Sequence, residues 1–188
     1  IMKLTFLGAA HEVTGSCYLL QVNDQNIMID CGMEQGRDIY ENQPLPLAPG
    51  QVDSLLLTHA HIDHSGRIPL LVKNGFHGRI LTTRLTADLM KIMLLDSAHI
   101  QESDAEYENR KGERAGREHV DPLYTEQDAL DVFKYVTTCE YKEKVDLCEG
   151  VSALFTDAGH LLGSASITLE LEENGVHKTI VFLSLIHI

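Results

Sequence analysis

The sequence predicts a layered α/β domain, and the order of its patterns is what predicts it. Residues 2–32 carry strand-type patterns, residues 64–136 carry helix-type patterns, and residues 151–184 return to strand-type alternation. Strands followed by helices and then strands favour sheets in the middle of the molecule with helices outside. The length of 188 residues suits one domain, or most of one.

The first strands are predicted from short β-rich runs separated by turn residues. The run 52–59 is short and nearly all apolar, which is typical of a strand buried on both faces. Residues 33–51 contain three prolines and are expected to be irregular. The remaining runs predict strands at 2–8, 16–22, 26–32 and 79–83, with the NDQN segment as a hairpin turn between the second and third.

Three helices are expected in the middle of the chain. The first covers 64–75 and stops at Asn74-Gly75, and the second runs from 84 to about 110 with apolar residues at helical spacing. Residues 108–120 are dense in charge and are expected to form an exposed loop. The third helix, 125–136, opens with an N-cap pattern. Strands at 151–159, 165–175 and 177–184 follow, the last two joined at Asn174-Gly175.

Composition restricts the function classes. The formal net charge is −13, with 15 Lys and Arg against 28 Asp and Glu. Phosphate binding needs clustered basic residues, so a nucleic-acid grip over the whole surface is excluded, whereas a local site in which metal ions supply the positive charge is not. The four cysteines form no C-x-x-C pair, no secretory signal begins the chain, and no apolar run approaches about 20 residues. These features predict a reduced, cytoplasmic protein that does not span a membrane.

The segment "THAHIDH", residues 58–64, places four ligand-type side chains within six positions. At an extended strand end, the spacing of two puts the imidazoles of His59 and His61 on one side, where they can share a metal. Asp63 and His64 follow where the chain turns toward a helix and suit a second metal. Imidazole with carboxylate is the ligand set of Zn²⁺, with Mn²⁺ or Fe as competitors. The alternative is a histidine-rich surface turn.

Two further strand ends complete this prediction. In "FTDAGHLLGSA", residues 155–165, His160 follows a glycine and is a natural third imidazole for the first metal, although alone it would be an ordinary loop histidine. Asp30 ends the run "IMID" just before Gly32. It is read either as a turn-initiating residue or as a carboxylate that accepts an N–H from a ligand histidine and fixes its tautomer.

These segments resemble a known family. "HAHIDH" matches the H-x-H-x-D-H signature of the metallo-β-lactamase superfamily, and "GAAHEVTGS" with "GHLLGSA" resembles its β-CASP branch of RNA-processing nucleases. The resemblance implies an αββα sandwich, here incomplete because only the N-terminal portion of that fold is matched. It implies zinc bound by His59, His61 and His160, a second zinc at Asp63 and His64, and Asp30 as a supporting carboxylate. Asp63 and His64 would serve catalysis by holding the metal that activates a hydroxide nucleophile.

The sequence departs from this family near its C-terminus. The family expects a metal-bridging Asp after the last strand, but Leu185 occupies that position, and the β-CASP domain and the closing lactamase segment do not follow. We therefore expect residues 1–182 to form a partial metallo-β-lactamase domain and 183–188 to be an atypical tail. His187 is read as accidental. The expected cofactor is Zn²⁺, two ions in the complete family site and about one held tightly here.

The resulting hypothesis is a zinc-dependent phosphodiester hydrolase whose full-length form acts on single-stranded RNA, with activity impaired in this chain. A glyoxalase-type thioester hydrolase and a non-catalytic metal-binding fragment are the alternatives. Two residues each have two alternative roles. His11 is either a substrate contact or a solvated loop histidine, and Ser164 either donates to a substrate phosphate or ends a tight turn.

Overall fold

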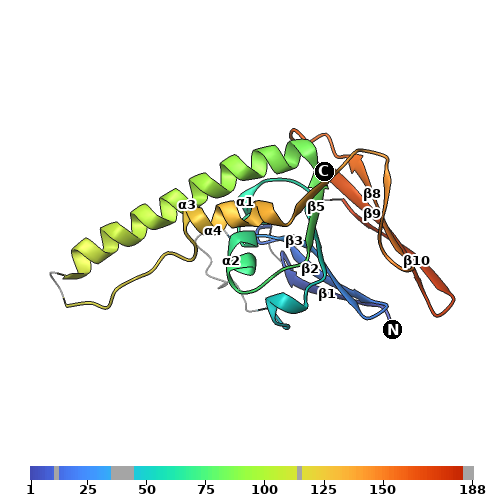
Figure 1. The fold of residues 1–188 in the computed structure, drawn as a ribbon, viewed down its shortest axis with the longest axis horizontal. Coiled ribbons are helices and arrows are strands. Elements are labelled where there is room, and N and C mark those ends of the chain that lie inside the picture. The colour runs from blue at the N-terminus through green and yellow to red at the C-terminus, as the bar shows by residue number, and fades with distance from the viewer. Residues whose placement is uncertain (11–12, 35–44, 114–115, 184–188) are drawn as a thin grey trace.

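The fold is described from a computed structural model, which places residues 1–10, 13–34, 45–113 and 116–183 (Figure 1). Two β-sheets lie against each other, and the helices cover the outer face of the first sheet (Figure 1). This arrangement confirms the predicted α/β class. The second outer layer of helices that an αββα sandwich would have is not among the described residues.

The first sheet has six strands in the order β1-β2-β3-β4-β5-β6. The first three are antiparallel, whereas β3 to β6 run parallel. Asn23 and Asp24 have positive φ angles at the predicted hairpin, as a type I′ turn requires. The strands are β1 (Lys3–Gly8), β2 (Cys17–Val22), β3 (Gln25–Cys31), β4 (Ser54–Leu56), β5 (Arg79–Thr83) and β6 (Val136–Cys139).

The second sheet is antiparallel, in the order β10-β9-β8-β7. Its strands are β7 (Lys144–Cys148), β8 (Val151–Asp157), β9 (Ala165–Glu173) and β10 (Val176–Phe182). Three of them were predicted, including the hairpin at Asn174-Gly175, where both residues have positive φ. The sequence patterns missed β7, and also β6 of the first sheet.

The helices differ from the prediction in three places. The expected helix 64–75 is two short helices, α1 (Ile62–Ser65) and α2 (Ile68–Lys73). Pro69 lies in the first turn of α2, where its missing N–H costs no hydrogen bond. The helix α3 (Arg84–Glu113) runs beyond the expected end, so 108–113 are helical rather than loop. Helix α4 (Glu126–Asp131) begins at the predicted cap, with Thr125 accepting from the backbone of Asp128, but it ends before the expected residue 136. A 3₁₀ turn follows it at Val132–Lys134, and another covers Pro49–Gln51.

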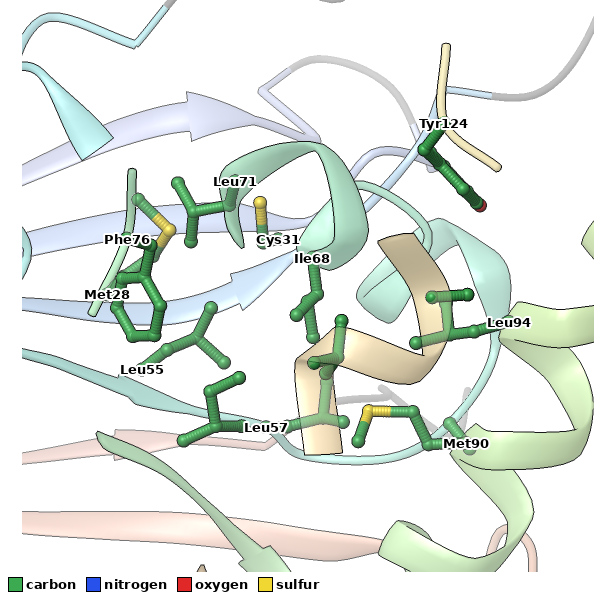
Figure 2. Packing of buried hydrophobic residues seen from close by; sticks show 14 of the residues in the cluster. Met28, Cys31, Leu55, Leu57, Ile68, Leu71, Phe76, Met90, Leu94 and Tyr124 are labelled. Carbon is green, nitrogen blue, oxygen red and sulfur yellow. The ribbon is translucent and has the colours of Figure 1, made fainter. Parts of the chain in front are cut away.

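The first sheet buries apolar side chains on both faces. One cluster packs Met28 of β3, Leu55 of β4 and Leu57 just after β4 against the helices (Figure 2). The other packs Ile29 and Leu56 against Phe155 and further residues of the second sheet. Alternate residues of the parallel strands point to opposite clusters, which explains their nearly continuous apolar sequences. Among the described residues, none of the helices combines the length and apolarity needed to cross a bilayer.

The topology brings several chain segments to one edge of the first sheet. Strands β3, β4 and β5 are parallel, so their carboxyl ends lead to Asp30, to residues 57–61 and to Thr83 at the same edge. The loop after β8 joins them, because the backbone N–H of Ala165 donates to the carbonyl oxygen of Thr58 at 2.9 Å. Carboxyl ends of parallel strands are where α/β sheets commonly hold their ligands.

Candidate metal centre

Three histidines from two segments converge at this edge. His59 and His61 follow β4, and His160 lies in the loop between β8 and β9. The Nδ1 of His61 lies 3.2 Å from the Nε2 of His59 and 3.2 Å from the Nε2 of His160. All three nitrogens lie within 4.8 Å of one another, and no other such group of three or more His, Cys, Asp or Glu occurs in the part of the chain that the structure describes.

This spacing fits a tetrahedral zinc ion. Zn–N bonds of about 2.1 Å at tetrahedral angles place neighbouring nitrogens about 3.4 Å apart, close to the observed 3.2 Å. Three protein ligands with one remaining position is also the pattern of catalytic zinc sites. The three residues present therefore fit the ion that the sequence predicts.

The histidine His59 is held in a form that can bind a metal. Thr58 Oγ1 donates to the carboxylate of Asp30 at 2.9 Å, so its oxygen can accept the Nδ1–H of His59 at 3.0 Å. That tautomer leaves the lone pair of His59 Nε2 facing the other two imidazoles. Burial, followed by the charges of His64, His61 and His160, lowers the pKa of His59 to about 2. The imidazole is thus neutral, as metal ligation requires.

Asp30 occupies a β-bulge, and this bulge directs its carboxylate into the site. Cys31 pairs with Cys17 but Ile29 pairs with Tyr18, so Asp30 is the extra residue of β3 and has a φ of 56°. Its side chain is 2% exposed. One oxygen accepts the backbone N–H of Thr58 at 2.8 Å, and the other accepts the Nδ1–H of His64 at 2.7 Å. This is the geometry expected of a carboxylate that orients ligand histidines.

His64 and Asp63 lie next to the three-histidine cluster on α1. The rings of His64 and His59 are 4.0 Å apart between centroids, and His64 Nε2 lies 3.7 Å from an oxygen of Asp63. Burial lowers the pKa of His64, but the hydrogen bond to Asp30 and the charges of Asp30 and Asp63 outweigh it, so the pKa is raised. Because Asp30 holds Nδ1, the remaining nitrogen available for a second metal is Nε2.

The turn that carries Asp63 depends on a glycine. A Cβ added to Gly32 would lie 1.7 Å from the carbonyl oxygen of Asp63, so only glycine permits this approach. The same carbonyl accepts the backbone N–H of Ser16 at 2.8 Å. The ends of β2 and β3 therefore lock the α1 turn against the sheet.

The two residues left open by the sequence have different outcomes. Ser164 is fully buried, and its Oγ accepts the backbone N–H groups of His160 and Leu161, both at 3.2 Å. This geometry favours the role of ending a tight turn, because a substrate would not reach the hydroxyl. His11 lies outside the described residues, as do Leu185 and His187.

Sequence reasoning assigned no role to Thr58, which links Asp30 to His59. Its only sequence signal is its place directly before the histidine cluster. It also missed Ser16, whose hydroxyl lies 3.4 Å from Asp30. Both act through a carboxylate 14 or more positions away, so neither could be found from local spacing.

Comparison with known proteins identifies the family of this chain. A family model described as the metallo-beta-lactamase superfamily matches residues 12–176. The chain is 34% identical to a ribonuclease of Thermus thermophilus, covering 96% of this chain and 37% of that protein. It is also 34% identical to a transcription termination factor FttA of Pyrococcus abyssi, covering 94% of this chain and 27% of that protein. The chain thus spans about a third of the length of these relatives.

Solved structures agree on the fold. The native FEZ-1 metallo-β-lactamase from Legionella gormanii superposes with a TM-score of 0.55 at 15% identity, covering 98% of this chain and 62% of that one. The described residues therefore represent part of that fold. The family match over most of the chain and the clustered histidines lead to one conclusion, which is that this chain belongs to the metallo-β-lactamase superfamily.

Proposed function

We propose that this chain is the N-terminal part of a zinc-dependent hydrolase of the β-CASP branch that cleaves RNA. The observation that carries this proposal is the convergence of His59, His61 and His160 within 4.8 Å at the edge of the sheet, in a chain that resembles a ribonuclease over 96% of its own length. The relatives' greater length supports the view that further segments complete the enzyme.

In this proposal His59, His61 and His160 hold one zinc ion, and Asp63 with His64 contributes to a second. When bound, the ions supply Lewis acidity, which lowers the pKa of water and offsets charge on a phosphodiester. This also reconciles RNA as substrate with a formal net charge of −13. Asp30 keeps His64 Nδ1 protonated and, through Thr58, keeps His59 Nε2 deprotonated, so both side chains meet a cation with a lone pair.

Asp63 and His64 are the proposed catalytic residues. The side chain of Asp63 is 25% exposed and so accessible to a substrate, whereas His64 is buried with its side chain 7% exposed. The four cysteines form no disulfide, which supports the proposed cytoplasmic location.

The test compares this 188-residue chain with its native-length form on a labelled single-stranded RNA with added Zn²⁺. We expect the longer protein to cleave and to lose cleavage on His61→Ala, and we expect little cleavage by the 188 residues alone. His177→Ala is the matched control, because His177 is an exposed histidine on β10 outside the cluster. Hydrolysis of a thioester but not of RNA by the longer protein would reject the proposal in favour of a glyoxalase-type enzyme.

A further inference from the structure

The loop that carries His160 is a compact unit with its own internal hydrogen bonds. Besides the two N–H groups held by Ser164 Oγ, the backbone N–H of Ser164 donates to the carbonyl of Leu161 at 3.0 Å, and that of Ala158 donates to the carbonyl of Ser164 at 3.1 Å. These bonds fix the shape of the loop. They do not fix where the loop lies relative to His59 and His61, which come from another segment of the chain.

Two bonds attach the loop to the first sheet: the backbone bond from Ala165 to Thr58 at the end of the loop, and a side-chain bond from Thr83, the last residue of β5. The hydroxyl of Thr83 donates to the carbonyl oxygen of Gly163 at 2.6 Å, and its side chain is buried, at 4% exposure. The hydroxyl oxygen of Thr83 also accepts the backbone N–H of Thr86 at 3.3 Å, which makes Thr83 the N-cap of the long helix α3. One hydroxyl therefore binds in both directions, toward the helix and toward the loop.

Close packing reinforces this attachment. Gly163 has a φ of 82°, and a Cβ added there would lie 2.4 Å from the backbone nitrogen of Thr86. The loop thus rests directly on the first turn of α3. A second side-chain bond, from Tyr141 Oη to the carbonyl of Ser164 at 2.9 Å, is partly redundant because Ala158 donates to the same oxygen.

We infer that Thr83 is a positioning residue for the metal centre, holding the His160 loop against the start of α3 so that the third imidazole meets the other two. This inference rests on the proposed zinc site and concerns a residue that does not itself touch the metal. Removing the hydroxyl keeps the internal bonds of the loop and its bonds to Thr58 and Tyr141 but detaches Gly163 from the start of α3, so His160 would spend less time at ligand distance. Loss of a group that orients a metal ligand typically weakens metal binding about 10- to 100-fold.

The experiment measures Zn²⁺ affinity by competition with a chelator and records the visible spectrum of the Co²⁺-substituted chain. Thr83→Val keeps the side-chain shape but removes the hydroxyl, and we expect about 10- to 100-fold weaker Zn²⁺ binding and an altered Co²⁺ spectrum, because one nitrogen ligand is lost. Thr83→Ser restores the hydroxyl and should restore both readouts. If Thr83→Val does not fold, Gly163→Ala disrupts the same contact from the loop side and should give the same spectral change.

Thr125→Val is the matched control. Thr125 caps α4 by accepting from Asp128 at 3.3 Å, so this variant also loses a helix cap, but it leaves the His160 loop untouched. Its metal binding should equal that of the wild type. Equal losses in the Thr83 and Thr125 variants, or wild-type affinity and spectrum in Thr83→Val, would overturn the inference. A wild-type chain that takes up no Co²⁺ would instead refute the metal centre itself.

Discussion

Asp30 offers the sharpest test of how the site is organised, through the change Asp30→Asn. Asparagine has nearly the same shape and also tolerates a positive φ, so the bulge at 56° adds little new strain. The amide oxygen can still accept the backbone N–H of Thr58. The amide nitrogen, however, would face the Nδ1–H of His64, which now donates to a carboxylate oxygen at 2.7 Å.

The expected cost follows from these contacts. A buried hydrogen bond to a charged group contributes about 1.5–3 kcal/mol, and Asp30 is 1% exposed, so solvent cannot replace the lost bond. We expect the metal-free variant to lose about 2–3 kcal/mol of unfolding free energy, with an unchanged slope in urea. His64 should also change tautomer, placing its proton on Nε2 and blocking that nitrogen for a metal.

The loss of unfolding free energy in Asp30→Asn should depend on pH in a defined direction. The pKa of His64 is raised in the folded chain, so its stabilising contribution is complete below the unfolded value of about 6.5 and fades as pH rises through the folded pKa. In Asp30→Asn the main cause of that rise is absent. The stability gap between wild type and variant should therefore narrow as pH increases above about 6.5.

Urea unfolding followed by circular dichroism measures these quantities, with Asp53→Asn as the matched control. Asp53 is an exposed carboxylate that accepts the backbone N–H of Asn26 at 2.8 Å, so the same substitution there should change stability by less than about 1 kcal/mol. Equal losses in the two variants, or a gap that widens with pH, would refute the assignment of Asp30 as the carboxylate that orients His64.

Two further predictions concern the metal and the acid side of the pH range. Dialysed protein should retain about one Zn²⁺ per chain, because the three-histidine site has three protein ligands whereas Asp63 and His64 supply only two. Metal analysis that finds two equivalents of Zn²⁺ after chelator competition would contradict this prediction. Burial is the largest cause that lowers the pKa of His59 to about 2 in the folded metal-free chain, whereas the same imidazole in the unfolded chain binds a proton near pH 6.5. The free energy of unfolding should therefore fall as pH drops below about 6.5, by up to about 1.4 kcal/mol per pH unit. Urea titrations at successive pH values should show this dependence of unfolding free energy on pH in the wild type and a weaker one in His59→Asn. Equal dependences in the two proteins would contradict the assignment of His59 as a buried, neutral imidazole.

The sequence predicted the residues of the site better than their connections. Strand ends and a spacing of two identified His59 and His61, and a glycine-flanked strand end identified His160. Each of these signals is local. The bond between Thr83 and Gly163 joins positions 80 residues apart, and nothing in either segment shows which loop will rest on the start of α3.

The missed strands have a physical cause as well. β6 has two exposed threonines among its four residues, so it lacks the apolar alternation that marks a half-buried strand. β7 does alternate, with Val145 and Leu147 half-buried, but over only five residues, and this short signal was missed. The pairing of these two strands with β5 and β8 is set by tertiary contacts. The unexpected extension of α3 through a charge-dense segment has a different cause. Charged side chains are compatible with a solvated helix and do not end it.

The bulge at Asp30 explains how a neutral, buried imidazole, that of His59, can stand at the base of the cluster. His61 Nδ1 lies 3.2 Å from Nε2 of both His59 and His160, a separation at which two imidazolium charges would repel strongly, and burial already opposes protonation of His59. One carboxylate, turned inward by an extra residue in β3, receives a hydrogen bond from His64 and sets the tautomer of His59 through Thr58. The Nε2 lone pairs of His59 and His64 are therefore set by Asp30 before any cation arrives. An organised site of this kind gains its full stabilisation only when a cation binds, so metal binding should raise the stability of the whole domain by mass action.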